Sequence, residues 1–161
     1  MVILLMGVTG SGKTTVGHAL AESLNWEFAD ADDFHSPANV AKMRTGIPLD
    51  DNDRAPWLAS LRHAIAGWLR DGTDVVLACS ALKQVYREEL MVSPEVRLVY
   101  LRGSRELIVD RLSQRHGHYM DPNLLDSQLA TLEEPRCAIT EDITADVPEI
   151  VRSIREALGR S

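Results

Sequence analysis

The sequence predicts an α/β fold of three layers, with a mostly parallel five-stranded sheet, helices on both faces and a small lid. Apolar runs rich in β-branched residues alternate with segments of helical periodicity along all 161 residues. A glycine-rich motif follows the first apolar run, and neither a linker nor an internal repeat interrupts the chain. This alternation is typical of βαβ units, and the length favours one domain spanning residues 1–161.

Five apolar runs are the expected strands: Val2–Met6, Trp26–Ala29, Val75–Cys79, Val96–Leu101 and Cys137–Ile143. Two helical segments place their apolar residues on one face, at Trp57, Leu58, Leu61, Ile65, Trp68 and Leu69, and at Val147, Ile150, Val151, Ile154 and Leu158. Ser104 is the expected N-cap of another helix, and Asp121 that of a further one because Pro122 follows it.

The composition is that of an ordinary globular chain, with 45% hydrophobic and 25% charged residues. A formal net charge of −7 argues against a nucleic-acid partner, which would favour a basic surface. No apolar run reaches the roughly 20 residues of a membrane span, and the N-terminal run lacks the basic residues of a signal peptide. We therefore expect no membrane association and a cytoplasmic location. Cys79 and Cys137 form no metal-type pair or disulfide framework and are expected to be free and buried.

The stretch GVTGSGKTT, from Gly7 to Thr15, matches the phosphate-binding pattern G-x-x-x-x-G-K-[ST] between an expected strand and an expected helix. Lys13 is expected to reach the β- and γ-phosphates, and the Thr14 hydroxyl to bind Mg²⁺. The alternative is a glycine-rich loop with no ligand. The pattern predicts that ATP and Mg²⁺ are bound here, by Gly7, Val8, Thr9, Gly10, Ser11, Gly12, Lys13, Thr14 and Thr15.

Motors, GTPases and small-molecule kinases all share this P-loop. No N-K-x-D motif occurs, and no D-x-x-G lies where a GTPase switch would be. The third expected strand ends in Cys79, Ser80 and Ala81, without the Asp-Glu pair usual in a translocating ATPase. Acids follow the second strand instead, and that placement favours a small-molecule kinase.

These acids lie in the stretch DADDFH, from Asp30 to His35. Two carboxylates spaced by two in an extended turn point the same way, toward the crevice outside the strand ends. Asp32 is the expected base for the acceptor hydroxyl, and Asp30 is expected to hold Mg²⁺ through water. His35 is a candidate partner for a substrate hydroxyl, or a locally satisfied histidine at a helix entry. Asp33 is interpreted as a solvated turn residue.

These motifs and others along the chain resemble those of the P-loop gluconate kinases. The resemblance rests on MGVTGSGKTT, DADDFHSPANVAKMRTGIPLDDNDRAPWL, CSALKQVYREEL, VYLRGSRELIVDRLSQRHGHYM and LLDSQLATLEEP, and spans nearly the whole chain. It implies transfer of the ATP γ-phosphate to the 6-hydroxyl of D-gluconate, a nucleoside-monophosphate-kinase-like fold, a mobile lid and a possible homodimer. Family members often have glycine where Ala31 stands, a difference that matters only if the position requires positive φ.

Gluconate needs a cation for its carboxylate and partners for its hydroxyls. The stretch GIPLDDNDRAPW offers Arg54, whose planar fork fits a carboxylate, beside the acceptors Asp51 and Asp53. The alternative is a charged cluster that caps a helix, a role that suits both aspartates. Three further residues are expected to bind substrate: Ser80, Lys83 and Arg87. For the last two, which lie one helical turn apart, a solvated helix face is the alternative.

The expected lid spans approximately residues 111–124. Arg111 and Arg115 lie one turn apart beside Gly117, which could serve as a hinge. Arg115 is the expected catalytic cation and Arg111 an expected ATP ligand, since arginines can stabilise charge on the transferring phosphoryl group. Alternatively, both complement a helix dipole at its C-terminus.

Two other functions stay open from the sequence. One is a different small-molecule kinase of the same fold, such as a shikimate kinase, although that family would favour a glycine-rich turn after the third strand. The other is a nucleotide-binding regulator without catalysis. The turn DITADVP after the fifth strand is a candidate adenine edge by position alone.

Overall fold

The structure is a computed structural model that describes residues 1–114 and 122–160. Its described strands form one sheet in the order β2-β3-β1-β4-β5, and every neighbouring pair is parallel. The predicted sheet is therefore confirmed, and it is parallel throughout. The strands are β1 (Val2–Met6), β2 (Glu27–Asp30), β3 (Val75–Ala78), β4 (Val96–Arg102) and β5 (Ile139–Asp142).

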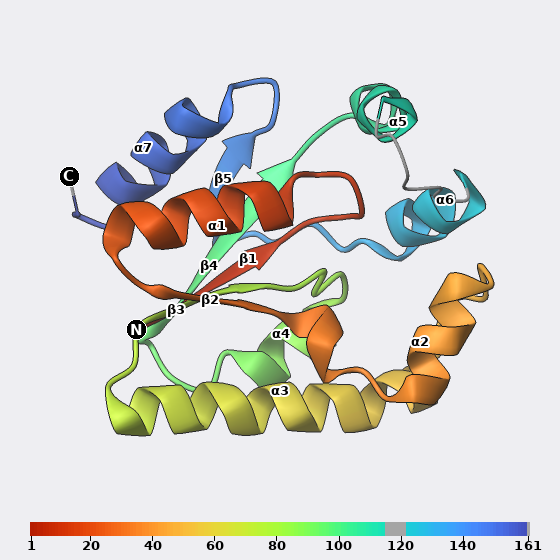
Figure 1. The fold of residues 1–161 in the computed structure, drawn as a ribbon, viewed down its shortest axis with the longest axis horizontal. Coiled ribbons are helices and arrows are strands. Elements are labelled where there is room, and N and C mark those ends of the chain that lie inside the picture. The colour runs from red at the N-terminus through yellow and green to blue at the C-terminus, as the bar shows by residue number, and fades with distance from the viewer. Residues whose placement is uncertain (115–121, 161) are drawn as a thin grey trace.

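Helices cover both faces of this sheet, as Figure 1 shows. One face carries α1 (Lys13–Leu24) and α7 (Val147–Ala157), and the opposite face carries α3 (Asp51–Asp71) and α4 (Gln84–Leu90). Three further helices lie toward the carboxyl ends of the strands: α2 (Pro37–Arg44), α5 (Arg105–Ser113) and α6 (Pro122–Thr131). The expected three-layer α/β arrangement is confirmed. Ser104 caps α5 as predicted, since its side chain accepts the Leu107 N–H.

The core has two parts, one on each side of the sheet. Strand β1 is fully buried at its centre and contributes alternate residues to both parts. The apolar face predicted for the long helix packs on one side through Trp57, Leu58, Leu61 and Ile65. The face predicted for the last helix packs on the other through Ile150, Val151 and Ile154. Burial of these stripes fixes the helices against a rigid sheet.

Strand β1 lies between β3 and β4, so the chain crosses from one side of β1 to the other. In open α/β sheets the crevice for ligands forms at such a switch point, outside the carboxyl ends of the strands. The P-loop follows β1 there, and the acids of DADDFH follow β2. The fold thus brings together two segments that the sequence keeps apart.

Some expected boundaries and burials differ from those observed. Strand β2 begins at Glu27 because the Trp26 N–H donates to the carbonyl of Ala21 and closes the end of α1. Cys79 is buried as expected, but Cys137 is exposed because it precedes β5 and lies outside its ladder. Within the described ranges, no helix is long and apolar enough to cross a membrane.

Candidate active site

Glycines shape the P-loop in two different ways. Gly10 and Gly12 have φ of 76° and 97°, in the left-handed region that other residues adopt only with strain. Gly7 is required for space instead, since a Cβ atom there would lie 2.5 Å from Ser11 Oγ. Helix α1 then begins at Lys13, directly after Gly12.

The start of α1 has the properties of an anion site. No side chain caps it, and no acid lies in its first turn, so the positive end of the helix dipole is not compensated. The Lys13 ammonium donates to the carbonyls of Gly7 (2.8 Å) and Val8 (3.0 Å) and so spans the loop. The hydroxyl of Ser11 is buried and has no hydrogen-bond partner among the described residues. These features fit the phosphates of a nucleotide.

A crevice of about 470 Å³ opens beside this loop and collects most of the predicted site residues. Four predicted P-loop residues do not line it: Gly7, Val8, Ser11 and Thr15. The first three are buried, and Thr15 is exposed on α1. Predicted residues from four separate segments do line it: Thr9, Gly10, Gly12, Lys13, Thr14, Asp30, Asp32, His35, Arg54 and Ser80.

Asp30 and Asp32 both line the crevice, but not through the extended turn that the sequence suggested. Asp30 ends β2, and residues Ala31–Phe34 form one 3₁₀ turn. The Asp30 carboxylate caps that turn by accepting the Asp32 N–H at 2.9 Å. Ala31 does not have positive φ, and its buried carbonyl accepts the Trp57 indole N–H at 2.7 Å. Alanine is therefore compatible with this position.

The electrostatic setting of Asp32 favours proton uptake. Burial in the crevice raises the pKa of its carboxyl above the ordinary value, and the negative charge of Asp30 raises it further. Lys13 opposes this shift, and Asp33 adds to it. The side chain is open to solvent at the crevice mouth, yet protein surrounds it on the other sides, which reduces its hydration. Such a carboxylate is a stronger base than a free aspartate.

His35 and Arg54 line the crevice from the start of α2 and α3. The His35 ring stacks on Trp57, with ring centroids 4.5 Å apart. Burial and the charge of Arg54 lower the pKa of His35, so its ring is neutral near pH 7. The Arg54 guanidinium donates to the Tyr86 hydroxyl at 3.1 Å. Both side chains are thus held in place by aromatic neighbours.

Two predicted substrate residues are not brought into the crevice. Lys83 forms a salt bridge with Asp51 (3.0 Å) outside it. Arg87 is buried, and its guanidinium donates to four oxygens of the surrounding loops: Ala81 O (2.8 Å), Leu82 O (3.1 Å), Gln84 Oε1 (3.0 Å) and Glu133 O (2.7 Å). In the turn after β3, Ala81 has φ of 44°, and the Leu82 carbonyl also accepts the Glu133 N–H at 2.8 Å. The structure therefore assigns Arg87 to the fold, against the prediction.

The aspartates before Arg54 divide their roles. The N-cap of α3 is Asp50, which the sequence reading missed, and Asp53 completes its capping box. Asp53 also accepts two hydrogen bonds from Lys42, both at 2.9 Å. Neither Asp51 nor Asp53 lines the crevice. Asp53 takes part in capping, as the alternative interpretation has it, and Asp51 forms the salt bridge with Lys83.

Of the two arginines predicted in the lid, the structure describes only Arg111. Arg111 lies on α5 and donates to the Ile143 carbonyl, in the turn after β5 that the sequence marked as an adenine edge. It does not line the crevice. Arg115 and half of the expected lid, residues 115–121, lie outside the described residues. The rest of the lid belongs to the ends of α5 and α6.

Helix α6 forms a wall of the crevice that the sequence reading missed. Leu124, Ser127, Gln128 and Thr131 face it, at the helical spacing that could have identified them. The Gln128 side-chain carbonyl accepts the Thr9 N–H of the P-loop at 2.7 Å. Helix α2 supplies a facing wall that was also missed, including the exposed Arg44.

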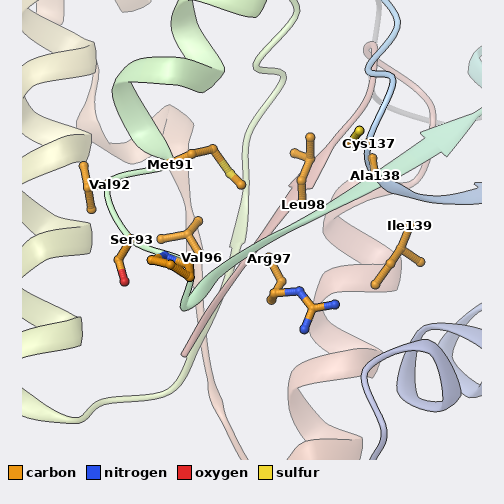
Figure 2. Close-up of a pocket in the computed structure, with 10 residues that line it drawn as sticks. Met91, Val92, Ser93, Val96, Arg97, Leu98, Cys137, Ala138 and Ile139 are labelled. Atoms are coloured by element: carbon orange, nitrogen blue, oxygen red, sulfur yellow. The ribbon is translucent and has the colours of Figure 1, made fainter.

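A second, wider hollow of about 760 Å³ lies along the start of β4 (Figure 2). Among the residues that the structure describes, Arg97 is the one charged residue that lines it, and no carboxylate does. Apolar side chains such as Met91, Val92 and Leu98 dominate the rest. It lies away from the P-loop and holds no set of groups for phosphoryl transfer.

Comparison with known proteins agrees with this geometry. The family model described as "AAA domain" matches residues 2–135. A probable gluconokinase of Rattus norvegicus is 45% identical, over 98% of this chain and 97% of the relative.

Two solved structures are similar throughout. A sugar kinase from Janibacter sp. HTCC2649 has a TM-score of 0.91 at 43% identity, covering 99% of this chain and 95% of the other. A gluconokinase from Sinorhizobium meliloti 1021 has a TM-score of 0.88 at 42% identity, covering 98% and 91%. On this similarity and on its P-loop crevice, the chain belongs to the gluconokinase family of P-loop kinases.

Proposed function

We propose that this protein transfers the γ-phosphate of ATP to the 6-hydroxyl of D-gluconate and so forms 6-phosphogluconate. One observation carries the proposal: a carboxylate with a raised pKa, Asp32, shares a crevice with the P-loop and with the cation Arg54. A kinase for an acidic polyol needs these three elements together. The family supports gluconate as the acceptor.

The P-loop would hold the phosphates through its backbone N–H groups and the positive end of α1. Lys13 would shift from the loop carbonyls to the β- and γ-phosphates and balance their charge. We also propose that Arg111, which donates to the Ile143 carbonyl in the turn after β5, contacts the nucleotide there. We keep Arg115 as the proposed lid cation.

Magnesium fits the residues present. Within the described ranges, no three His, Cys, Asp or Glu side chains form a metal cluster. Mg²⁺ in kinases needs no such cluster, because it binds phosphate oxygens, water and one or two side chains. The Thr14 hydroxyl and, through water, Asp30 would hold it, and both line the crevice. When bound, the ion neutralises charge on the phosphates.

Asp32 would act on the acceptor. Its carboxylate accepts the proton of the 6-hydroxyl as that oxygen bonds to the γ-phosphorus, and the bond to the β–γ bridging oxygen breaks to release ADP. The raised pKa makes this transfer more favourable near neutral pH. Asp30 serves this step by fixing the turn that carries Asp32.

The remaining contacts would select the acceptor. Arg54 would bind the gluconate carboxylate as a planar fork. His35, which is neutral near pH 7, and Ser80 can each donate to or accept from a hydroxyl. We also propose a homodimer, as the family resemblance implies, and a cytoplasmic location.

The test is an ADP-release assay with MgATP against gluconate, other sugar acids, neutral sugars and shikimate. The proposal expects turnover that depends on gluconate and exceeds that with neutral sugars by at least tenfold. Turnover with shikimate and not gluconate would favour the related kinase. Nucleotide binding without turnover of any acceptor would favour the regulator.

A further inference from the structure

A hydrogen-bonded chain runs behind Arg54, away from the crevice. The Arg54 guanidinium donates to the Tyr86 hydroxyl at 3.1 Å, and that hydroxyl donates in turn to Asp51. Asp51 also accepts from the Lys83 ammonium at 3.0 Å. Tyr86 is only 5% exposed and lies on α4, whereas Arg54 and Asp51 lie on α3. The chain therefore fixes the two helices relative to each other at the crevice wall.

The partner of Arg54 in this chain is neutral. The described part of the protein contains no salt bridge to Arg54, whose guanidinium donates to the phenol of Tyr86. The carboxylate in this hydrogen-bonded series, Asp51, is separated from Arg54 by the Tyr86 hydroxyl and forms a salt bridge with Lys83. A carboxylate in direct contact would neutralise the guanidinium, whereas a phenol orients it and leaves its charge available.

Asp51 also sets the direction of the phenol. Because the phenol hydroxyl donates its hydrogen bond to Asp51, a lone pair of the phenol oxygen remains to accept from Arg54. The Tyr86 ring also attracts the Arg54 guanidinium by a cation–π interaction, since the guanidinium carbon lies 5.5 Å from the ring centroid. A hydrogen bond whose acceptor is itself polarised is stronger than an isolated one.

We propose that Tyr86 is a positioning residue that holds Arg54 with its charge free, so that the guanidinium fork is preorganised for the carboxylate of the acceptor. This role rests on the proposed function, in which Arg54 binds that carboxylate. Preorganisation lowers the cost of ordering the arginine on binding. It acts on affinity for an acidic acceptor and leaves the phosphoryl step unchanged.

Tyr86→Phe tests this role, because it keeps the ring and removes only the hydroxyl. We expect KM for gluconate to rise about 3- to 10-fold, the range for losing one hydrogen bond, with kcat and KM for ATP unchanged. Inhibition by D-glucitol, a polyol without the carboxylate, should be unaffected. After Arg54→Lys, adding Tyr86→Phe should raise KM no further, since the group it positions is already lost.

Tyr100→Phe is the matched control. Its phenol is also buried and donates to a carboxylate, Glu134, at 3.1 Å, but it lies outside the crevice. The same atom is removed, so both variants lose a buried hydroxyl. KM for gluconate should stay at the wild-type value in this variant.

An unchanged KM for gluconate in Tyr86→Phe would overturn the positioning role of Tyr86. So would an equal rise in KM when Tyr86→Phe is added to the wild type and to Arg54→Lys. If Tyr86→Phe does not fold, Asp51→Ala replaces it, since Asp51 is 68% exposed. It should raise KM at least twofold by freeing the phenol, and an unchanged KM would refute the proposal. A wild-type protein inactive on gluconate would refute the proposed function, whereas normal wild-type turnover with unaltered Tyr86→Phe refutes only the positioning role.

Discussion

Arg87→Met should destabilise the fold and leave substrate selection in place. The Arg87 side chain is only 3% exposed, and its guanidinium donates to three backbone carbonyls and one side-chain oxygen. Methionine has a similar length and an apolar end, so it fills the space without donating. The carbonyls of Ala81 and Glu133 would then lose the guanidinium donor, whereas the Leu82 carbonyl would keep the Glu133 N–H.

The expected cost follows from these contacts. Leaving a buried acceptor unsatisfied costs about 1–3 kcal/mol. The contacts with Ala81 and Leu82 are fully buried, whereas those with Gln84 and Glu133 are only partly so, and water can replace some of the latter. We therefore expect a loss of about 2–4 kcal/mol in the free energy of unfolding, because one buried and one partly buried carbonyl lose their charged donor. For a chain of this length, that corresponds to a Tm lower by about 4–16 °C.

Thermal and urea unfolding, followed by circular dichroism, measure this loss. Arg105→Met is the matched control, since Arg105 forms a salt bridge with Asp126 at the surface and is half exposed. Surface pairs contribute about 0–1 kcal/mol, so its Tm should hardly change. A wild-type Tm in Arg87→Met, combined with a large rise in KM for gluconate, would refute the structural role and restore Arg87 as a substrate ligand.

Four further changes test the crevice. Lys13→Ala should abolish phosphoryl transfer with an unchanged Tm, because Lys13 contacts the loop and not the core; near-normal kcat would contradict the P-loop role. Asp32→Asn should lower kcat by about 10²–10⁴-fold, the range for a general base, while gluconate binding persists; a kcat above a tenth of the wild-type value would exclude Asp32 as the base. In the wild type, kcat/KM should fall as pH drops through the raised pKa of Asp32, and Asp30→Asn should move that fall to lower pH because it removes a charge that raises the pKa; an unmoved profile would assign the titration to another group. Arg54→Lys should raise KM for gluconate more than it lowers kcat, by about 1.5–3 kcal/mol in binding, and an equal loss in kcat would place Arg54 near the transferred phosphate.

Local patterns predicted the sheet, the apolar helix faces and the P-loop because each depends on residues close in sequence. The strand at Val2–Met6 and the glycines after it need no distant contact to be recognised. The convergence of Asp30 and Asp32 with Lys13 was also predictable, since parallel strands end at one edge of the sheet. The family resemblance added the substrate, which no spacing of residues specifies.

Contacts between distant segments were beyond the reach of these patterns. Arg87 looks like a solvated helix residue until the loop at Glu133 closes over it, 46 positions away. Asp30 caps a 3₁₀ turn, whereas an extended turn was expected, and the sequence of four residues fits either conformation. The docking of Gln128 on Thr9 depends on how α6 packs beside the P-loop, although the helical spacing of its crevice residues was visible.

The phosphorus NMR spectrum of the product tests the central claim most directly. The protein is incubated with MgATP and gluconate, and the proton-coupled ³¹P signal of the new ester is recorded. Transfer to the 6-hydroxyl places the phosphate on a CH₂ group, so the signal should be a triplet, and it should be almost absent with Asp32→Asn. A doublet from a secondary ester, or inorganic phosphate alone, would contradict the proposed reaction.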